Sequence, residues 1–326
     1  MPALPDYKVS PLVQPKPEDY GDYDLDRALA SVMGLHAIIP SDAFTAETLG
    51  TERAGNGVLI RENGVVLTIG YLITEAETVW LHLNDGRVVP GHVLGYDQAT
   101  GFGLVQALAK LDLPALPLGD STMIPLEEKV VVGGAGGRQK SVAARVVGKQ
   151  EFAGYWEYVL DEAIFTAPAH PNWGGTALIG PAGDLLGIGS LQLERATNKN
   201  KTEHLNMVVP IDDLKPILDD LLKFGRPNRA PRPWLGLYAT EVDDSIVVAG
   251  LSERGPAGKT GLRPGDRILA VRDEPISTLA SFWRRVWASG AAGSEVVLQV
   301  VRDKETMKVR ITSADRTRLL KAPKLH

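Results

Sequence analysis

Short apolar runs separated by glycine-containing turns dominate the chain from about residue 55 onward. The apolar runs 57–61 and 65–69 flank Asn63-Gly64, and a second pair of runs flanks Asp85-Gly86. Either dipeptide between two apolar runs is a strong signal for a β-hairpin. Similar runs continue to residue 208 and fall into two sets of about six. Many short strands at this spacing predict a β-barrel or sandwich, so the two sets predict two barrels side by side.

The segments before and after these sets show other patterns. Residues 1–24 are rich in Pro, Asp and Tyr and lack periodicity, which predicts an extended arm packed through Tyr20 and Tyr23. Residues 24–39 predict a short helix leading into a strand. Residues 210–224 place their leucines on one face, carry two aspartates in the first turn and end at Gly225, as a helix does.

A linker rich in Pro and Arg follows this helix and marks a domain boundary. Beyond it, short strands and one helix at 279–288 predict a smaller α+β domain. We divide the chain into an arm and lead-in segment (1–44), a double β-barrel (45–225), a linker (226–233), the smaller domain (234–313) and a tail (314–326).

Composition narrows the function classes. The 326 residues carry a net charge of −5, with 44% apolar and 23% charged residues, which indicates a globular chain. The negative charge argues against nucleic acid or an anionic membrane as the main partner. The chain has no cysteine, which excludes disulfides, thiolate metal sites and cysteine catalysis. No basic start followed by an apolar run is visible at the N-terminus, so we expect a cytoplasmic protein, or a periplasmic one if that end is trimmed.

Several stretches taken together resemble the HtrA (Deg) family of trypsin-like proteases with C-terminal PDZ domains. They are GNGVLIRENGVVLTIGYLI (55–73), NDGRVVPGHVLGYDQATGFGL (84–104), PALPLGDS (114–121) and HPNWGGTALIGPAGDLLGI (170–188). Their order and spacing agree with the family over about residues 45–313. The resemblance implies a trypsin-like double β-barrel followed by one PDZ-like domain, and no cofactor or metal.

In the same register, other residues stand at the three positions of the catalytic triad. The family's general-base His falls on Tyr71, its orienting Asp on Gly101 and its nucleophilic Ser on Gly174, with Pro171 anchoring the last assignment. A serine nucleophile needs a base that takes its proton and a group that orients the base. A tyrosine titrates far above the range of a general base, and neither glycine has a side chain. The resemblance therefore predicts a pseudoprotease.

The loop around the nucleophile position retains other candidates. The family's oxyanion hole maps to the backbone N–H groups of Asn172 and Gly174, with Asn172 in place of the usual Gly. Trp173 is large enough to fill the emptied cleft. His170 is either a substitute base or a surface or loop histidine; the second interpretation is favoured because no Ser lies beside it. Ser190 closes the second strand of the stretch; it is either a residue that lines the specificity pocket or an ordinary strand-end hydroxyl, which is common.

The PDZ-like domain carries the predicted binding site. WLGLY (234–238) resembles the family's carboxylate-binding loop, so the resemblance assigns a peptide's C-terminal carboxylate to the backbone of Leu235, Gly236 and Leu237. The other groove wall is the predicted helix, through its apolar residues Leu279, Phe282, Trp283 and Val286. The alternative is a module that packs on the barrels with its groove occupied.

Two further patterns have plain explanations. His82 and His92 flank Asp85-Gly86, but no carboxylate spacing supports a metal site there. The glycines at 133–137 lack a following Lys-Ser/Thr, so we expect a loop between strands and not a phosphate loop.

We therefore predict an inactive HtrA-like homologue that binds polypeptides or protein C-termini: a scaffold, a chaperone-like holder in protein quality control, or a regulator of an active protease relative. The alternatives are an active serine endopeptidase that uses misregistered or non-standard residues, disfavoured because no Ser lies between Phe165 and Ile188, and a structural module without a ligand. HtrA relatives form trimers through N-terminal aromatic residues, a role that Tyr20 and Tyr23 are placed to fill.

Overall fold

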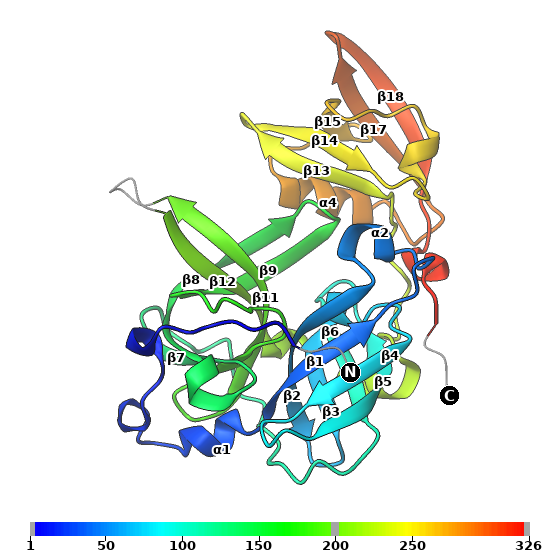
Figure 1. Cartoon of the computed structure of the whole chain (residues 1–326). Helices are drawn as coiled ribbons and strands as arrows, with labels where there is room; N and C mark the ends of the chain where they lie inside the picture. Colours follow the sequence, from blue (N-terminus) through cyan, green and yellow to red (C-terminus); the bar gives the residue numbers. More distant parts are fainter. Residues whose placement is uncertain (1–3, 197–201, 323–326) are drawn as a thin grey trace. The chain divides into compact units, whose positions relative to one another are not determined.

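Two closed β-barrels and a separate β-sheet make up the computed structural model, which describes residues 4–196 and 202–322 (Figure 1). The first barrel has the strand order β1-β2-β3-β6-β5-β4 and the second β10-β11-β12-β9-β8-β7. The strands of the first barrel are β1 (Val32–Ile38), β2 (Glu52–Arg61), β3 (Val65–Ile69), β4 (Thr78–His82), β5 (Val88–Tyr96) and β6 (Phe102–Ala107). Those of the second are β7 (Lys129–Gly133), β8 (Val142–Gly154), β9 (Tyr158–Ala167), β10 (Ala177–Ile179), β11 (Leu185–Ala196) and β12 (Thr202–Pro210). The predicted mainly β, double-barrel fold is confirmed.

The helices are short. The α-helices are α1 (Leu25–Leu29), α2 (Ala46–Leu49), α3 (Leu218–Phe224) and α4 (Leu279–Trp287). The 3₁₀ turns are η1 (Pro11–Val13), η2 (Pro17–Asp19), η3 (Gly70–Leu72), η4 (Gly137–Lys140), η5 (Ile211–Asp213), η6 (Ala257–Lys259) and η7 (Arg316–Leu319). Within the described ranges, no helix is both long and apolar enough to cross a membrane.

The first barrel starts earlier than the expected residue 45. Strand β1 pairs with both β2 and β4, so the barrel does not close without it. The sequence pattern did not mark β1 as a barrel strand, because β1 is buried along almost its whole length. It therefore lacks the alternation of apolar and polar residues that a half-exposed strand shows.

The predicted helix over 210–224 is interrupted. The chain forms the turn η5 and then α3, with Pro216 between them. Proline lacks a backbone N–H and its ring clashes with the preceding helical turn, which explains why one continuous helix does not form. The expected end is confirmed: Gly225 adopts φ +71° and its N–H caps the carbonyl of Leu221.

The N-terminal arm packs along the second barrel. Val9 belongs to that barrel's apolar core, and Tyr20 is buried, with its hydroxyl donating to the carbonyl of Val130 at 3.3 Å. Tyr23 lies against Gly183, where an added Cβ would come within 2.5 Å of the tyrosine ring. In this structure Tyr20 is thus covered by its own chain and not presented to a neighbouring copy.

The C-terminal sheet belongs to a second compact unit. Its strand order is β13-β14-β15-β17-β18, with β16 beside β15. The strands are β13 (Leu237–Val242), β14 (Ser245–Leu251), β15 (Arg267–Val271), β16 (Glu274–Pro275), β17 (Glu295–Arg302) and β18 (Glu305–Thr312). This unit comprises Arg229–Leu319 together with Glu151–Asp161, the tip of the β8–β9 hairpin; the remaining described residues form the other unit. We call Glu151–Asp161 the hairpin tip.

Candidate functional site

The three residues predicted to stand in place of the triad lie together between the two barrels. The backbone N–H of Gly70, next to Tyr71, donates to the carbonyl of Gly101 at 2.6 Å. A Cβ atom added to Gly174 would lie 2.7 Å from the hydroxyl oxygen of Tyr71. The structure thus brings Tyr71, Gly101 and Gly174 into one place, although none of them supplies a nucleophile or a base.

Tyr71 acts as a hydrogen-bond donor in this site. Its hydroxyl donates to the carbonyl oxygen of Ser190 at 2.9 Å. That carbonyl is available because the pairing of β11 with β12 shifts register between Gly189 and Leu191. Burial raises the pKa of Tyr71 above its ordinary value, and a hydrogen bond with the side chain of Trp173 opposes the rise in pKa only in part. A neutral phenol with this pKa does not accept a proton from a nucleophile.

Arg53 fixes the turn that carries Tyr71. Its Nη1 atom donates to the carbonyl oxygens of Tyr71 at 2.7 Å and Thr74 at 3.0 Å. Burial lowers the pKa of Arg53 to about 10, although the nearby Glu75 carboxylate raises it. The sequence pattern did not single out Arg53, since a lone arginine ahead of the first predicted hairpin (57–69) gives no signal of its contacts.

Asn56 holds the loop of the nucleophile position. Its Nδ2 donates to the carbonyls of Asn172 at 2.9 Å and Gly174 at 3.1 Å, and its backbone N–H donates to Gly174 at 2.8 Å. Gly175 adopts φ +78°, and a Cβ there would lie 1.9 Å from the carbonyl oxygen of Asn56. Gly175, the second glycine of the pair, is therefore needed for this close approach of two backbones.

One of the two predicted oxyanion-hole donors is already engaged. The N–H of Asn172 donates to Nδ1 of His170 at 3.1 Å. An oxyanion hole needs donors aimed at the oxygen that will carry the charge. In the conformation described, this N–H points to an imidazole instead.

His170 is not a surface residue, as the favoured interpretation allowed; its side chain is completely buried. Its Nε2 lies 2.7 Å from the carbonyl of Lys140, and its backbone N–H donates to Oδ1 of Asn206 at 2.6 Å. Burial lowers the pKa of His170, against the two backbone hydrogen bonds, which raise it. The ring is a neutral structural element whose two nitrogens are both used, so it is not a free base.

The predicted carboxylate-binding loop holds a carboxylate of its own chain. Oε1 of Glu157 accepts the N–H groups of Leu235 at 3.0 Å, Gly236 at 2.8 Å and Leu237 at 3.2 Å. Gly236 adopts φ +69° and lies against Gly255, where an added Cβ would meet a backbone atom at 2.7 Å. This close approach turns three successive donors toward one point, an arrangement that suits an anion.

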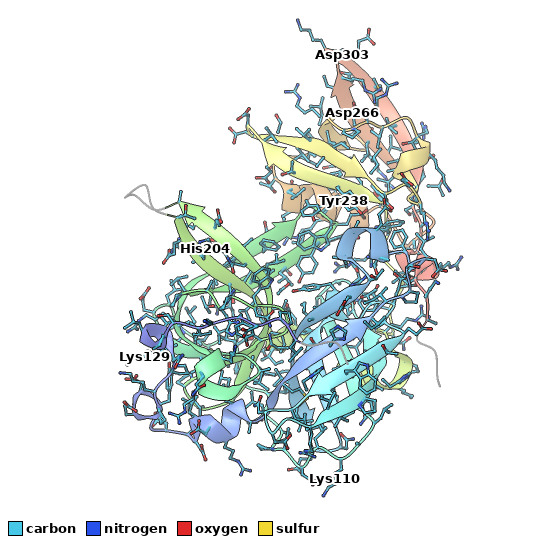
Figure 2. All side chains as sticks on the ribbon, in the orientation of Figure 1. Lys110, Lys129, His204, Tyr238, Asp266 and Asp303 are labelled. Carbon is cyan, nitrogen blue, oxygen red and sulfur yellow. The ribbon has the colours of Figure 1, made fainter. Side chains whose placement is uncertain are left out.

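The predicted groove walls are also occupied. Leu279, Phe282, Trp283 and Val286 of α4 are buried in one apolar cluster with Leu235 and Leu237. Strand β13 is the edge of its sheet, and its Ala239 N–H donates to the carbonyl of Tyr155 at 3.0 Å. The ring of Tyr155 lies 5.9 Å from that of Tyr238, which Figure 2 labels.

The remaining candidates take structural roles. The glycines 133–137 connect β7 to β8, as expected, and the N–H groups of Gly134 and Gly136 donate to Ser141 and Asn84. The described residues contain no group of three or more His, Cys, Asp or Glu side chains able to hold a metal ion.

Two family models match the chain. Residues 55–188 match the trypsin-like peptidase domain and residues 233–312 match the PDZ domain. The first match contains Tyr71, Gly101 and Gly174, and the second contains the loop that holds Glu157.

The chain is also similar to curated relatives and solved structures. A "Probable periplasmic serine endoprotease DegP-like" of Pseudomonas savastanoi pv. phaseolicola is 26% identical over 80% of this chain and 56% of its own length. The serine endoprotease DegS of Escherichia coli K12 is 23% identical over 79% of this chain and 76% of its own. The structure of the HtrA-type protease AlgW with tripeptide is similar in fold, with a TM-score of 0.54, 21% identity and coverage of 94% of this chain and 98% of that one.

The chain spans about half the length of the DegP-like relatives that it matches. The comparisons do not support the expected cytoplasmic location, because the DegP-like relative is described as periplasmic.

Proposed function

We propose that this HtrA-type serine protease homologue, a trypsin-like domain followed by a PDZ domain, does not hydrolyse peptide bonds and binds polypeptides through its PDZ groove. By extension from the relatives, we place it in the periplasm, as a holder of polypeptides or a regulator of an active protease.

One observation carries the proposal of inactivity. The side chain at the base position is a tyrosine whose hydroxyl lies where a side chain at Gly174 would begin. A water molecule in this place would also lack a base, because Tyr71 is a neutral phenol whose hydroxyl donates to Ser190. In serine proteases, loss of the triad leaves only about 10³- to 10⁴-fold acceleration over the uncatalysed reaction, which is far below useful turnover.

The loop 235–237 supports the proposal of peptide binding. Three backbone donors meet on one carboxylate oxygen beside an edge strand and an apolar helix face. A polypeptide C-terminus can offer these same groups: a carboxylate, a backbone that adds to a strand, and an apolar side chain.

The test of inactivity is the degradation of reduced casein by the purified full chain. We expect no cleavage above that of buffer, and no labelling by a fluorophosphonate reagent for activated serines. Cleavage that copurifies with the chain through two columns, and that a substitution within the chain abolishes, would instead favour the alternative of an active endopeptidase with non-standard residues.

A matched variant separates a dead site from a closed one. Tyr71→His, Gly101→Asp and Gly174→Ser together restore the three side chains. Activity in this variant would support a cleft that is otherwise formed.

We also predict a homotrimer; a light-scattering mass near that of one chain would reject it.

A further inference from the structure

The ligand already present in the groove comes from the chain itself. Glu157 lies in the turn of the hairpin tip and is only 7% exposed. Besides the three bonds to its Oε1, its Oε2 accepts the N–H of Leu235 at 3.2 Å. Every donor of the loop is thus directed at a side-chain carboxylate 78 residues away in the sequence from the first of them.

The backbone of the hairpin tip takes the place of an added strand. Tyr155, two residues before Glu157, supplies the carbonyl that accepts from Ala239 on the free edge of β13. The preceding Gly154 accepts the indole N–H of Trp283 on α4 at 2.9 Å. The tip is therefore bonded to both walls of the groove.

Apolar side chains of the hairpin tip complete the contact. Val159 is 8% exposed and belongs to the same core cluster as Leu235, Phe282 and Trp283, and Ala153 packs against that cluster. A carboxylate, a strand-like backbone and an aliphatic side chain are the three features by which a chain terminus binds an edge-strand groove. The hairpin tip provides all three.

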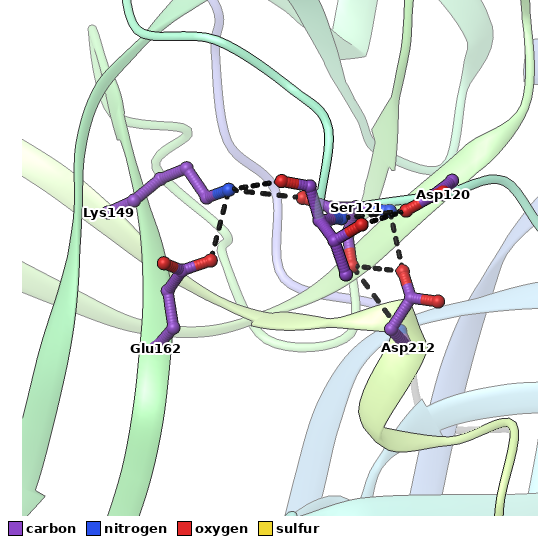
Figure 3. Close-up of polar contacts among 6 residues, drawn as sticks. Asp120, Ser121, Lys149, Glu162 and Asp212 are labelled. Carbon is purple, nitrogen blue, oxygen red and sulfur yellow. Dashed lines mark hydrogen bonds and ion pairs between the residues drawn. The ribbon is translucent and has the colours of Figure 1, made fainter.

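Charged residues hold both ends of the hairpin tip. Arg284 on α4 pairs with Glu151 at its start and with Asp161 at its end. Just outside the tip, Lys149 pairs with Glu162 at 3.0 Å and donates to the carbonyl of Thr122 at 2.9 Å (Figure 3). The strands that carry the tip are therefore cross-linked at the points where they enter and leave it.

We propose that the hairpin tip is the resident ligand of the PDZ groove, and that a polypeptide binds there only by displacing Glu157 with its own C-terminal carboxylate. This inference rests on the proposed peptide-binding function, and it adds that the hairpin tip regulates peptide binding. Because one carboxylate replaces another, the number of hydrogen bonds to the loop need not change. The competitor must overcome the high local concentration of a tethered ligand, about millimolar for short connections.

The measured affinity of the natural chain is then reduced by the fraction of molecules whose groove is open. The probe is a fluorescein-labelled Gly-Gly-Tyr-Ala-Tyr-Val peptide with a free carboxylate, chosen because valine is the aliphatic residue that the tip places in the core. Its C-terminal amide is the second probe. In Glu157→Gln, the amide oxygen can still accept from the loop, but an NH₂ group that cannot accept replaces the second carboxylate oxygen, which accepts the N–H of Leu235, so the tip binds less well.

We expect the full-length Glu157→Gln chain to bind the carboxylate peptide at least roughly tenfold more tightly than the natural chain, and to bind the amide weakly. Glu62→Gln is the matched control, since it removes an exposed glutamate from the turn between β2 and β3, and should bind like the natural chain. Glu157→Asp, which keeps the charge but shortens its reach, provides a second variant in case Glu157→Gln does not fold.

Amide hydrogen exchange measures, without any added peptide, whether the hairpin tip occupies the groove. The N–H groups of Leu235, Gly236, Leu237 and Ala239 should be protected in the natural chain and exchange faster in Glu157→Gln. Those of Ser252 and Ala257, which donate to carbonyls of the same loop, serve as internal references and should not change.

The outcomes separate the two proposals. If all chains bind the carboxylate peptide equally and reject the amide, the groove binds peptides and the displacement proposal is overturned. If none of the chains binds either peptide, the proposed peptide-binding function fails, and hydrogen exchange alone tests whether the tip occupies the groove. Unprotected amides in the natural chain would overturn the resident ligand. Protection that is lost in Glu157→Gln would support it.

Discussion

The hydroxyl oxygen of Tyr71 lies 2.7 Å from the position that a Cβ atom of Gly174 would occupy. The two residues are therefore a matched pair: the tyrosine fits because residue 174 has no side chain. Introducing a serine at 174 in the presence of Tyr71 forces one of the two groups to move.

We expect Gly174→Ser alone to lower the free energy of unfolding by about 1 to 3 kcal/mol, the usual cost of overpacking. Tyr71→His in the same chain should recover most of that loss, so a double-mutant cycle measured by urea unfolding should show strong coupling. Gly21→Ser is the control, because no atom lies within 4 Å of a Cβ there. Additive effects of the two substitutions would contradict the packing relationship.

Gly101 is expected to resist replacement for a backbone reason. It adopts φ +87°, a conformation that residues with a Cβ rarely take, at a cost of about 1 to 3 kcal/mol. Gly101→Ala should therefore lower the midpoint of thermal unfolding, and Gly101→Asp should lower it less because Asp tolerates positive φ better than Ala. Gly21→Ala is the reference. An unchanged midpoint for Gly101→Ala would show that the turn relaxes freely.

The hydrogen bond from Tyr71 to Ser190 is expected to make a measurable contribution to the free energy of unfolding. Tyr71→Phe should lower the free energy of unfolding by about 0.5 to 1.5 kcal/mol, since the carbonyl of Ser190 loses its donor. Tyr155→Phe, at a ring that is 56% exposed, should have a smaller effect. Equal losses in the two variants would argue against a specific role of the Tyr71 hydroxyl.

His170 should make the protein less stable in acid. Burial holds its pKa below the ordinary value of 6.5, so the unfolded chain takes up a proton before the folded chain does. The stabilising contribution is present above pH 6.5 and is lost as the pH falls toward the folded-state pKa. The unfolding midpoint of the natural chain should fall more between pH 7 and 5 than that of His170→Gln. Parallel pH profiles would count against a buried neutral histidine.

Glu157 should give the opposite pH dependence. Burial raises its pKa from 4.5 to about 7, although the N–H groups of 235–237 and the charge of Arg316 lower it. The folded chain therefore binds the proton more strongly, and the stabilising contribution is full below pH 4.5 and lost as the pH rises through 7. Between pH 5 and 8, the natural chain should lose stability relative to Glu157→Gln, by at most about 1.4 kcal/mol per pH unit. A constant difference between the two would indicate that Glu157 stays ionised throughout.

The local patterns of the sequence predicted most of the elements. Turn dipeptides such as Asn63-Gly64 set the hairpins, and short-range chemistry is enough for them. The predictions were wrong where a tertiary or local exception intervened: Pro216 divides an otherwise helical stretch, and β1, expected as a strand of the lead-in segment, is part of the first barrel. His170 looked like an ordinary loop residue, because burial depends on what packs over the loop.

The sequence by itself determined that residues 71, 101 and 174 are a tyrosine and two glycines; that they stand at the positions of the triad is a prediction from the register. It also pointed to a carboxylate loop at 235–237. Only the tertiary structure decided what these places contain. The Tyr71 hydroxyl reaches Ser190 across 119 residues, and Glu157 reaches Leu235 across 78. Contacts over such separations depend on how the barrels and the hairpin fold back, which no local pattern encodes.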